Sequence, residues 1–335
     1  METGKAVLLF IVGLVLLIKG GDWFVDGAVG IAKRFHLPEI LIGATVVSIG
    51  TTLPEVMVSA TSAIEGHSEI SYGNAIGSII CNTALIAALT VAIRPGTVHR
   101  KSLGLPVTFF FGTAAFYSII SYTTKTYSRW TGILMLGIFL VYMVLSVLQA
   151  RREQSAEPEA EDKPQPEEPA EKPSGWQLCK DILFLILGGG LIALGAKLLV
   201  DNGTFLAGKM GVPESVIALT FVALGTSLPE LVTAITALVK GHGALSLGNI
   251  IGANLFNLVL VCGVSVTIRP FGVPQSSTVA GMNTSLLVEI PLMLAVMGIL
   301  TIPALIKGKL YRYQGILLLC LYAGFCVFQF LIPIL

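Results

Sequence analysis

The chain repeats itself at a spacing of 175 residues, and each copy places an acidic residue inside a long apolar stretch. Gly-Thr-Thr-Leu-Pro-Glu at residues 50–55 returns as Gly-Thr-Ser-Leu-Pro-Glu at residues 225–230. The same offset gives ten identities in the 21 positions from 38 to 58 and six in the twelve from 71 to 82. Gap-free similarity over two segments indicates an internal duplication. The fold must therefore be built from two equivalent halves.

Composition defines the environment in which these halves fold. Hydrophobic residues make up 54% of the chain and charged residues 12%, and the mean hydropathy is +0.83. Repeated apolar runs of about 20 residues are typical of membrane spans. We therefore predict an all-α polytopic protein in the lipid bilayer of the cell membrane. The net charge of +1 gives no reason to expect a nucleic-acid partner.

Ten transmembrane helices are predicted from the apolar runs, five in each half. They lie near residues 6–24, 39–64, 70–92, 103–122, 130–149, 178–200, 213–239, 245–267, 283–305 and 312–334. The first run lacks an arginine-rich start and a small-residue cleavage site, so we expect a retained helix rather than a signal peptide. An odd number of spans per half makes the second half enter the bilayer upside down. The sequence thus predicts two inverted five-helix repeats, residues 1–150 and 176–335.

Loop charges indicate the orientation of these repeats. With the N-terminus outside, fourteen Lys and Arg fall on the inner side and five on the outer side. Because basic residues favour the cytoplasmic side, we expect both termini outside and the central loop in the cytoplasm. That loop, residues 151–175, is rich in Glu, Pro, Ala and Lys and has little apolar surface to bury. It is predicted to be a disordered linker.

The duplicated motif has the chemistry of a cation site. Glu55 and Glu230 lie within predicted spans, where ionisable residues are unfavourable and usually functional. Pro54 and Pro229 lack an N–H, so we expect broken helices whose freed carbonyl oxygens can bind sodium or calcium. Two close carboxylates repel each other, so the empty site should attract monovalent cations or a proton.

The next predicted span of each half adds polar groups along one helical stripe. In the first half these are Asn74, Ser78 and Asn82, and in the second half Asn249, Ala253 and Asn257. Two carboxylates surrounded by neutral oxygens suit calcium. Two alternatives remain open. The asparagines can simply bond between packed helices, and the two glutamates can form buried salt bridges with Lys19 and Lys197.

The doubled motif, followed in each half by Gly-Asn-x-Ile-Gly at 73–77 and 248–252, resembles the alpha repeats of the cation/calcium exchanger superfamily, specifically the prokaryotic sodium/calcium exchangers. The resemblance implies that Glu55 and Glu230 are central calcium ligands, together with the backbone carbonyls of Thr51 and Thr226. The implied sodium sites use Thr52, Ser227, Ser78 and the carbonyls of Ser48 and Ala223, and Asn82 and Asn257 lie at the edge of the cluster. The first span of each half would form a pair that slides past the other eight.

Two departures from the family pattern, and one position that differs from the pattern expected of potassium-dependent members, bear on the ions. Ala253 replaces Ser78 in the second half and removes a side-chain oxygen, so the number of sodium ions stays open. Ile79 stands opposite Asn254, which makes the flanking sites unequal. Asn257 carries no charge for a third cation, which argues against potassium co-transport.

The leading hypothesis is therefore a sodium-driven calcium antiporter. A proton/calcium or other cation antiporter of the same fold is the alternative, and a channel is a third class. The sequence lacks the hydrolase and metalloprotease motifs of common enzymes, so we expect neither enzymatic activity nor a cofactor. The five cysteines are expected to be packing residues and the four histidines to lie in loops. The oligomeric state is left open.

Overall fold

The computed structural model describes residues 2–156, 175–210, 225–274, 278–279 and 282–331. Helices dominate, and several continue one another through a wider π-helical turn. The elements of the first half are α1 (Glu2–Arg34), α2 (Glu39–Ile42), η1 (Gly43–Val47), α3 (Ser48–Glu65), α4 (Ser68–Cys81), η2 (Asn82–Ala87), α5 (Ala88–Ile93), α6 (Arg100–Thr123), β1 (Thr126–Tyr127) and α7 (Arg129–Ala156). Those of the second half are α8 (Gly175–Lys209), α11 (Leu228–Val239), α12 (Gly243–Phe256), η4 (Asn257–Val261), α13 (Cys262–Ile268), β2 (Phe271–Gly272), β3 (Thr278–Val279), β4 (Met282–Asn283), η5 (Ser285–Glu289), α14 (Ile290–Lys307) and α15 (Arg312–Leu331).

The prediction of a helical membrane fold is confirmed, but the count of ten spans is not. Within the described residues, eight helices are long and apolar enough to cross a membrane. Of the two other expected spans, α11 is a short apolar helix and α15 is not among the eight. Residues 211–224, the start of the expected seventh span, lie outside the described residues. The inverted arrangement of ten helices therefore stays a prediction.

The predicted linker is too long at both ends. Helix α7 continues to Ala156 and α8 begins at Gly175, so residues 151–156 and 175 are helical. Arg, Glu, Gln and Ala are good helix formers, and they extend α7 beyond its apolar part. Residues 157–174, the rest of the predicted linker, lie outside the described residues.

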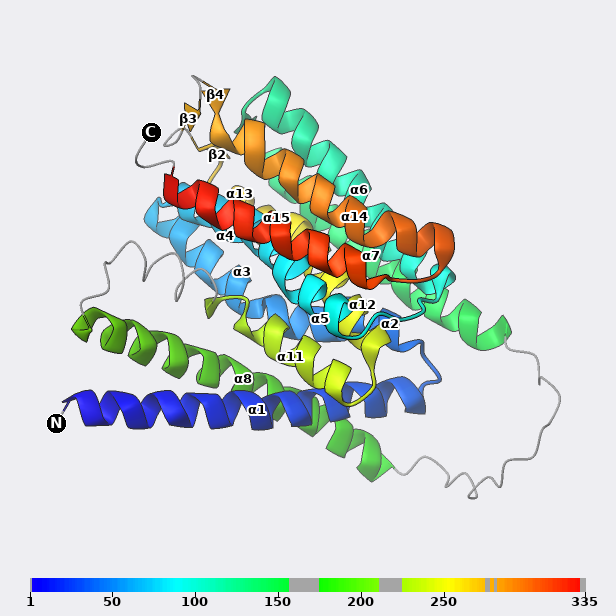
Figure 1. Ribbon diagram of the computed structural model, residues 1–335. Helices are drawn as coiled ribbons and strands as arrows, with labels where there is room; N and C mark the ends of the chain where they lie inside the picture. The colour runs from blue at the N-terminus through cyan, green and yellow to red at the C-terminus, as the bar shows by residue number, and fades with distance from the viewer. Residues whose placement is uncertain (1, 157–174, 211–224, 275–277, 280–281, 332–335) are drawn as a thin grey trace.

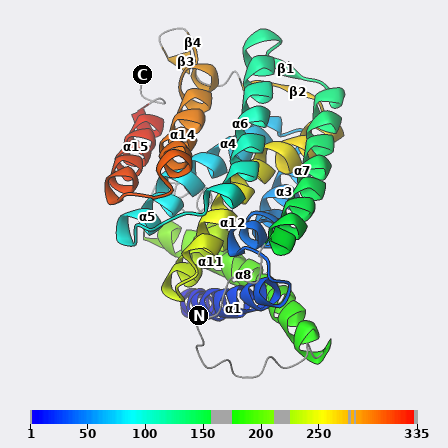
Figure 2. The same ribbon diagram turned by 90° about the vertical axis from the view of Figure 1, so that its right-hand side faces the viewer.

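Helices α1 and α8 form an antiparallel pair at one side of the molecule (Figures 1 and 2). Glycines bring their backbones together. A Cβ atom added at Gly13 would lie 2.9 Å from the carbonyl oxygen of Gly195, and one at Gly20 would lie 2.9 Å from that of Gly188. Such close approach is possible only without side chains, as in other small-residue contacts between membrane helices.

The remaining helices form a body whose two halves meet at both ends (Figure 1). At one end β1 pairs with β2, with Thr126 opposite Gly272. At the other end Thr97 forms a bridge with Lys309. Thr97 and Gly272 are 175 residues apart, so duplicated positions make the same kind of contact at opposite ends of the body.

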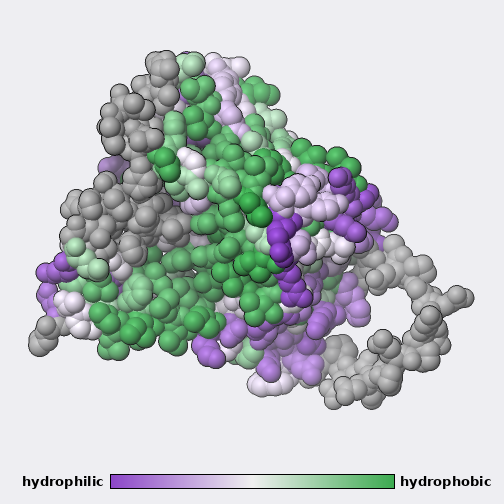
Figure 3. All heavy atoms as spheres, in the orientation of Figure 1, coloured by the Kyte–Doolittle hydropathy of each residue, from purple (hydrophilic) through white to green (hydrophobic). Residues whose placement is uncertain are grey.

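Buried hydrophobic side chains form a core inside the body, and the outer surface is apolar as well. The largest fully buried side chains include Tyr72, Tyr117 and Phe256, and Tyr117 stacks on Tyr127 of β1 with ring centroids 4.8 Å apart. Figure 3 shows hydrophobic side chains over the middle of one face, with hydrophilic ones toward its edges. A surface of this kind suits a lipid environment.

Replacement of Gly188 by alanine should destabilise the α1–α8 pair. The added Cβ would lie 2.8 Å from the Gly20 carbonyl oxygen, so the helices must separate, at an expected loss of about 1–3 kcal/mol. Thermal unfolding in detergent measures the effect. The matched control is Gly190→Ala, because no described atom lies within 4 Å of its added Cβ. Equal melting temperatures for the two variants would contradict the packing described here.

Candidate metal centre

Two carboxylates, one from each half, lie together in the interior. Glu55 belongs to α3 and Glu230 to the first turn of α11, and both are 0% exposed. They are close enough for their charges to interact directly. Within the described part of the chain, none of their four oxygens has a hydrogen-bond partner. Buried carboxylates without partners are strongly destabilising, so the pair requires a cation or a proton.

The two motifs differ in backbone conformation. Helix α11 begins at Leu228, with Ser227 as its N-cap and Pro229 in the first turn, so the predicted interruption is present there. Helix α3, however, runs through Pro54 without a break, and the expectation of a broken helix is wrong for the first half. A proline inside a helix removes one hydrogen bond, here to the Gly50 carbonyl, and neighbouring helices can compensate for that loss.

Hydroxyl groups of both motifs surround the carboxylates. Thr51 and Thr52 lie beside the Glu230 carboxylate, so the first motif contacts the acid of the second. The side-chain oxygens of Thr52 and Ser227 are buried and have no partner among the described atoms. Thr226 is half-buried. The side-chain oxygens of Thr52 and Ser227 are therefore available to a bound ion.

Asn82 and Asn257 occupy equivalent places in the two halves. Each is fully buried, and neither its amide nitrogen nor its amide oxygen has a partner in the described residues. Each is also the first residue of a π-helical turn, η2 and η4 respectively. Such turns are rare and frequently occur at functional sites. These features support Asn82 and Asn257 as candidate residues of a cation site.

Asn249 and Asn74 instead connect helices, as one of the sequence alternatives proposed. The Oδ1 atom of Asn249 accepts hydrogen bonds from Thr51 at 3.1 Å and from Ser48 at 3.3 Å. Asn74 donates to the backbone oxygen of Glu55 at 3.2 Å and to Ser59 Oγ at 2.8 Å. These bonds position the residues around Glu55, and they commit the hydroxyls of Ser48 and Thr51. The backbone carbonyls of those two residues remain the candidate ligands.

The other expected site residues have mixed outcomes. Ser78 is buried, and Ala253 in the equivalent place is buried but offers no side-chain oxygen. Ala223 lies outside the described residues. No described cluster contains three or more His, Cys, Asp or Glu side chains. Calcium at this site would therefore depend on neutral oxygens for most of its ligands.

The salt-bridge alternative is wrong for the described chain. Lys197 Nζ lies 3.2 Å from Asp201 in its own helix, and its side chain is 73% exposed. Lys19 is also exposed. Among the ion pairs of the described residues, none includes Glu55 or Glu230.

Two features of the site were not predicted. Cys81, expected to be a packing residue, lies beside Ser227 and Glu230; its place next to Asn82 in the polar stripe was the available signal. A cavity of about 10 Å³ separates the two motifs from the α1–α8 pair and is lined by Phe24, Thr51, Pro54, Gly189 and Pro229 among others. It has room for about one water molecule. The α1–α8 pair thus lies against both motifs at this point.

Membrane-length helices that enclose two charged groups and unpartnered oxygens are typical of cation transporters. The sequence profile of the family described as "Sodium/calcium exchanger protein" matches residues 5–148 and 180–331. The putative antiporter CaxA of Alkalimonas amylolytica is 34% identical over 96% of this chain and 97% of its own length. The sodium/calcium exchanger MaX1 of Methanosarcina acetivorans is 30% identical over 97% and 98%.

A solved structure of the sodium–calcium exchanger NCX_Mj superposes on this chain with a TM-score of 0.78 and 31% identity, covering 96% of this chain and 97% of that one. Its crystals were soaked with sodium and strontium. This chain belongs to the sodium/calcium exchanger family, so it is an integral membrane protein of the cation/calcium antiporter class. Its relatives are transporters rather than enzymes.

Substitution of either glutamate by glutamine should separate folding from ion binding. Glu55→Gln and Glu230→Gln each remove one buried charge. In the absence of ions the free energy of unfolding should therefore increase by roughly 1–3 kcal/mol, and the melting temperature should rise with it. The stabilisation that calcium gives the unmodified protein should disappear. Thermal unfolding with and without calcium measures both effects. Glu289→Gln is the control, because Glu289 lies in η5 and bonds to Gln329 instead. A calcium-induced shift retained in both site variants would argue against this site.

Proposed function

We propose that this protein exchanges sodium for calcium across the cell membrane by alternating access. One observation carries the proposal: Glu55 and Glu230 come from equivalent points of the two halves and meet, fully buried and without hydrogen-bond partners among the described residues. A site with a charge of −2 and only oxygen ligands suits calcium or several monovalent ions. Such a site is unfavourable when empty, and this favours exchange over uniport.

Calcium is proposed to bind between the two carboxylates, with the backbone carbonyls of Thr51 and Thr226 completing its ligands. The buried hydroxyls of Thr52 and Ser227, which lack partners in the described chain, support flanking sodium sites. The remaining proposed sodium ligands are Ser78 and the carbonyls of Ser48 and Ala223. Asn82 and Asn257 border the central ion, and no resident cofactor is proposed.

The α1–α8 pair is proposed as the moving part. Its backbone contacts through Gly13, Gly20, Gly188 and Gly195 make it one unit, and only a small cavity separates it from the site. Movement of the pair along the body would uncover the glutamates on one side and cover them on the other. We further propose that both termini are outside and residues 151–175 face the cytoplasm, as the loop charges favour.

Proton/calcium exchange is the second candidate. Unpartnered buried carboxylates can accept protons as well as metal ions, so the glutamates alone allow either driving ion. The hydroxyls of Thr52 and Ser227 favour sodium, because a proton needs no such ligands.

Calcium uptake into proteoliposomes separates these candidates. Sodium-loaded vesicles should take up calcium, potassium-loaded vesicles should not, and Glu55→Gln and Glu230→Gln should abolish uptake. Glu289→Gln serves again as the matched control. Uptake driven by a proton gradient without sodium would establish the second candidate, and calcium transport in both site variants would refute the site itself.

Acid should inhibit the transport. Protons compete with calcium for the two carboxylates, so the half-saturating calcium concentration should rise as the pH falls. Initial uptake rates over a range of calcium concentrations and pH values test this. A half-saturating concentration that does not change with pH would count against carboxylate ligation.

Ser78 should contribute to the sodium dependence. Ser78→Ala removes a buried hydroxyl and makes the first half resemble the second, which has Ala253 there. The half-saturating sodium concentration should increase about five- to thirtyfold, as expected for loss of roughly 1–2 kcal/mol of ligand interaction, while that for calcium changes little. Ala253→Ser is the reciprocal variant. Equal effects on both ions would remove Ser78 from the sodium site.

A further inference from the structure

Lys240 joins the α1–α8 pair to the body at one end. It is the C-cap residue of α11, the helix that carries Glu230. Its ammonium lies 2.8 Å from Asp26 Oδ1 and 3.4 Å from Asp22 Oδ1, and it donates to the Asp22 carbonyl oxygen at 3.0 Å. Both aspartates belong to α1. The Lys240 side chain is only 25% exposed, so solvent screens this contact less than it screens an open surface pair.

The duplication places the opposite charges at the other end. Lys240 corresponds to Glu65, the last residue of α3, and Asp22 corresponds to Lys197 in α8, both at the 175-residue offset. Each half therefore has an ionisable residue at the end of its glutamate-bearing helix and, at the place of Asp22 or Lys197, an oppositely charged residue of the paired helix. The charges are reversed between the two pairs: the residue at the end of the glutamate-bearing helix is basic in one (Lys240) and acidic in the other (Glu65). Asp26, the nearer partner of Lys240, corresponds to Asp201 and keeps its sign.

Only one of these two pairs is formed. At the second position Lys197 bonds to Asp201 of its own helix, and the side chains of both are more than half exposed. Glu65 is exposed and takes part in no ion pair of the described residues. Among the described residues, an ion pair thus joins the α1–α8 pair to the body at Lys240, and none joins it at Glu65.

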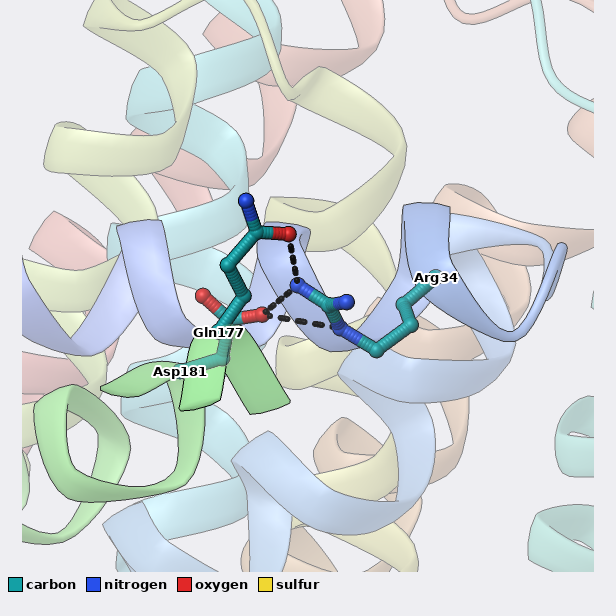
Figure 4. Close-up of polar contacts among 3 residues, drawn as sticks. All are labelled: Arg34, Gln177 and Asp181. Atoms are coloured by element: carbon teal, nitrogen blue, oxygen red, sulfur yellow. Dashed lines mark hydrogen bonds and ion pairs between the residues drawn. The ribbon is translucent and has the colours of Figure 1, made fainter. Parts of the chain in front are cut away.

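Helices α1 and α8 are tied to each other independently of these contacts. Arg34 of α1 forms an ion pair with Asp181 of α8 at 3.0 Å and also donates to Gln177 (Figure 4). A displacement of one helix therefore takes the other with it. In inverted repeats the two access states are related by exchange of the roles of the halves. By that symmetry the opposite state would bring Lys197 to the place beside Glu65 that Asp22 now has beside Lys240.

We propose that these residues form two reciprocal latches, Lys240 with Asp22 and Asp26 in the present state, and Lys197 with Glu65 in the opposite state. The proposal rests on alternating access as proposed above. Each latch stabilises one state and must open for the pair to move. Loss of one latch should shift the ratio of the two states about three- to tenfold, the range expected for a partly exposed ion pair.

The latches can be tested in transport by comparing the apparent calcium affinity on the two faces of the membrane. Lys240→Gln should raise the apparent calcium affinity on one face of the membrane and lower it on the other, by three- to tenfold in ratio, and Glu65→Gln should do the reverse. Glu65→Lys should act like Glu65→Gln, and adding Lys197→Glu should restore the unmodified ratio. Arg129→Gln is the matched control, because Arg129 of α7 donates to the Ile268 carbonyl oxygen within the body and contacts neither α1 nor α8 in the described hydrogen bonds. Equal changes on both faces in the Lys240 and Glu65 variants would refute the latches.

Distance measurements test the latches without any transport. Spin labels at Lys5 of α1 and Ile70 of α4, both exposed, report the position of the pair against the body after the five cysteines are replaced. Lys240→Gln and Asp22→Asn should deplete the distance population of the present structure, and Glu65→Gln should enrich it. If the distance populations shift in opposite directions in the Lys240 and Glu65 variants, but the protein transports no calcium, the latches are supported and the proposed function is refuted. Unchanged populations in these variants would refute the latches alone.

Discussion

The structure depends on the burial of two like charges at one place. Glu55 and Glu230 are both 0% exposed, and no described group neutralises them. The fold must supply the energy that holds them there, because repulsion and desolvation both oppose it. The close helix packing of the body supplies it, with Asn249 linking the first motif to the second half through Ser48 and Thr51.

The internal duplication explains why the two buried carboxylates come from different halves of the chain. Each half supplies one carboxylate, one π-helical turn that begins with asparagine, and one loop that pairs at an end of the body. The halves are nevertheless unequal at several points. Helix α3 runs through its proline whereas α11 begins at its proline, and Ala253 lacks the hydroxyl of Ser78. These differences fall near Glu55 and Glu230, so the duplication does not make the surroundings of the two carboxylates equivalent.

The membrane class, most helix positions and the acidic pair were predictable, because apolar run length and a repeated motif are local properties of the sequence. The contacts of the site were not. The bond from Thr51 to Asn249 joins residues 198 positions apart, and the proximity of Cys81 to Glu230 depends equally on how helices pack. The continuity of α3 through Pro54 also depends on its neighbours, since the ring alone favours a break. Local chemistry thus predicted candidate ligands, whereas the contacts that hold them in place could not be predicted.

The lengths of α1 and α8 have a consequence for the surrounding lipid. With 33 and 35 residues at about 1.5 Å per residue, each helix is roughly 50 Å long, whereas the hydrocarbon core of a bilayer is about 30 Å thick. The pair must therefore tilt strongly or extend into the headgroup region. Because the pair is bonded to itself along its length, its tilt changes as a whole when the bilayer becomes thicker or thinner. Acyl-chain length in the host membrane is thereby linked to the position of the element that covers the two glutamates.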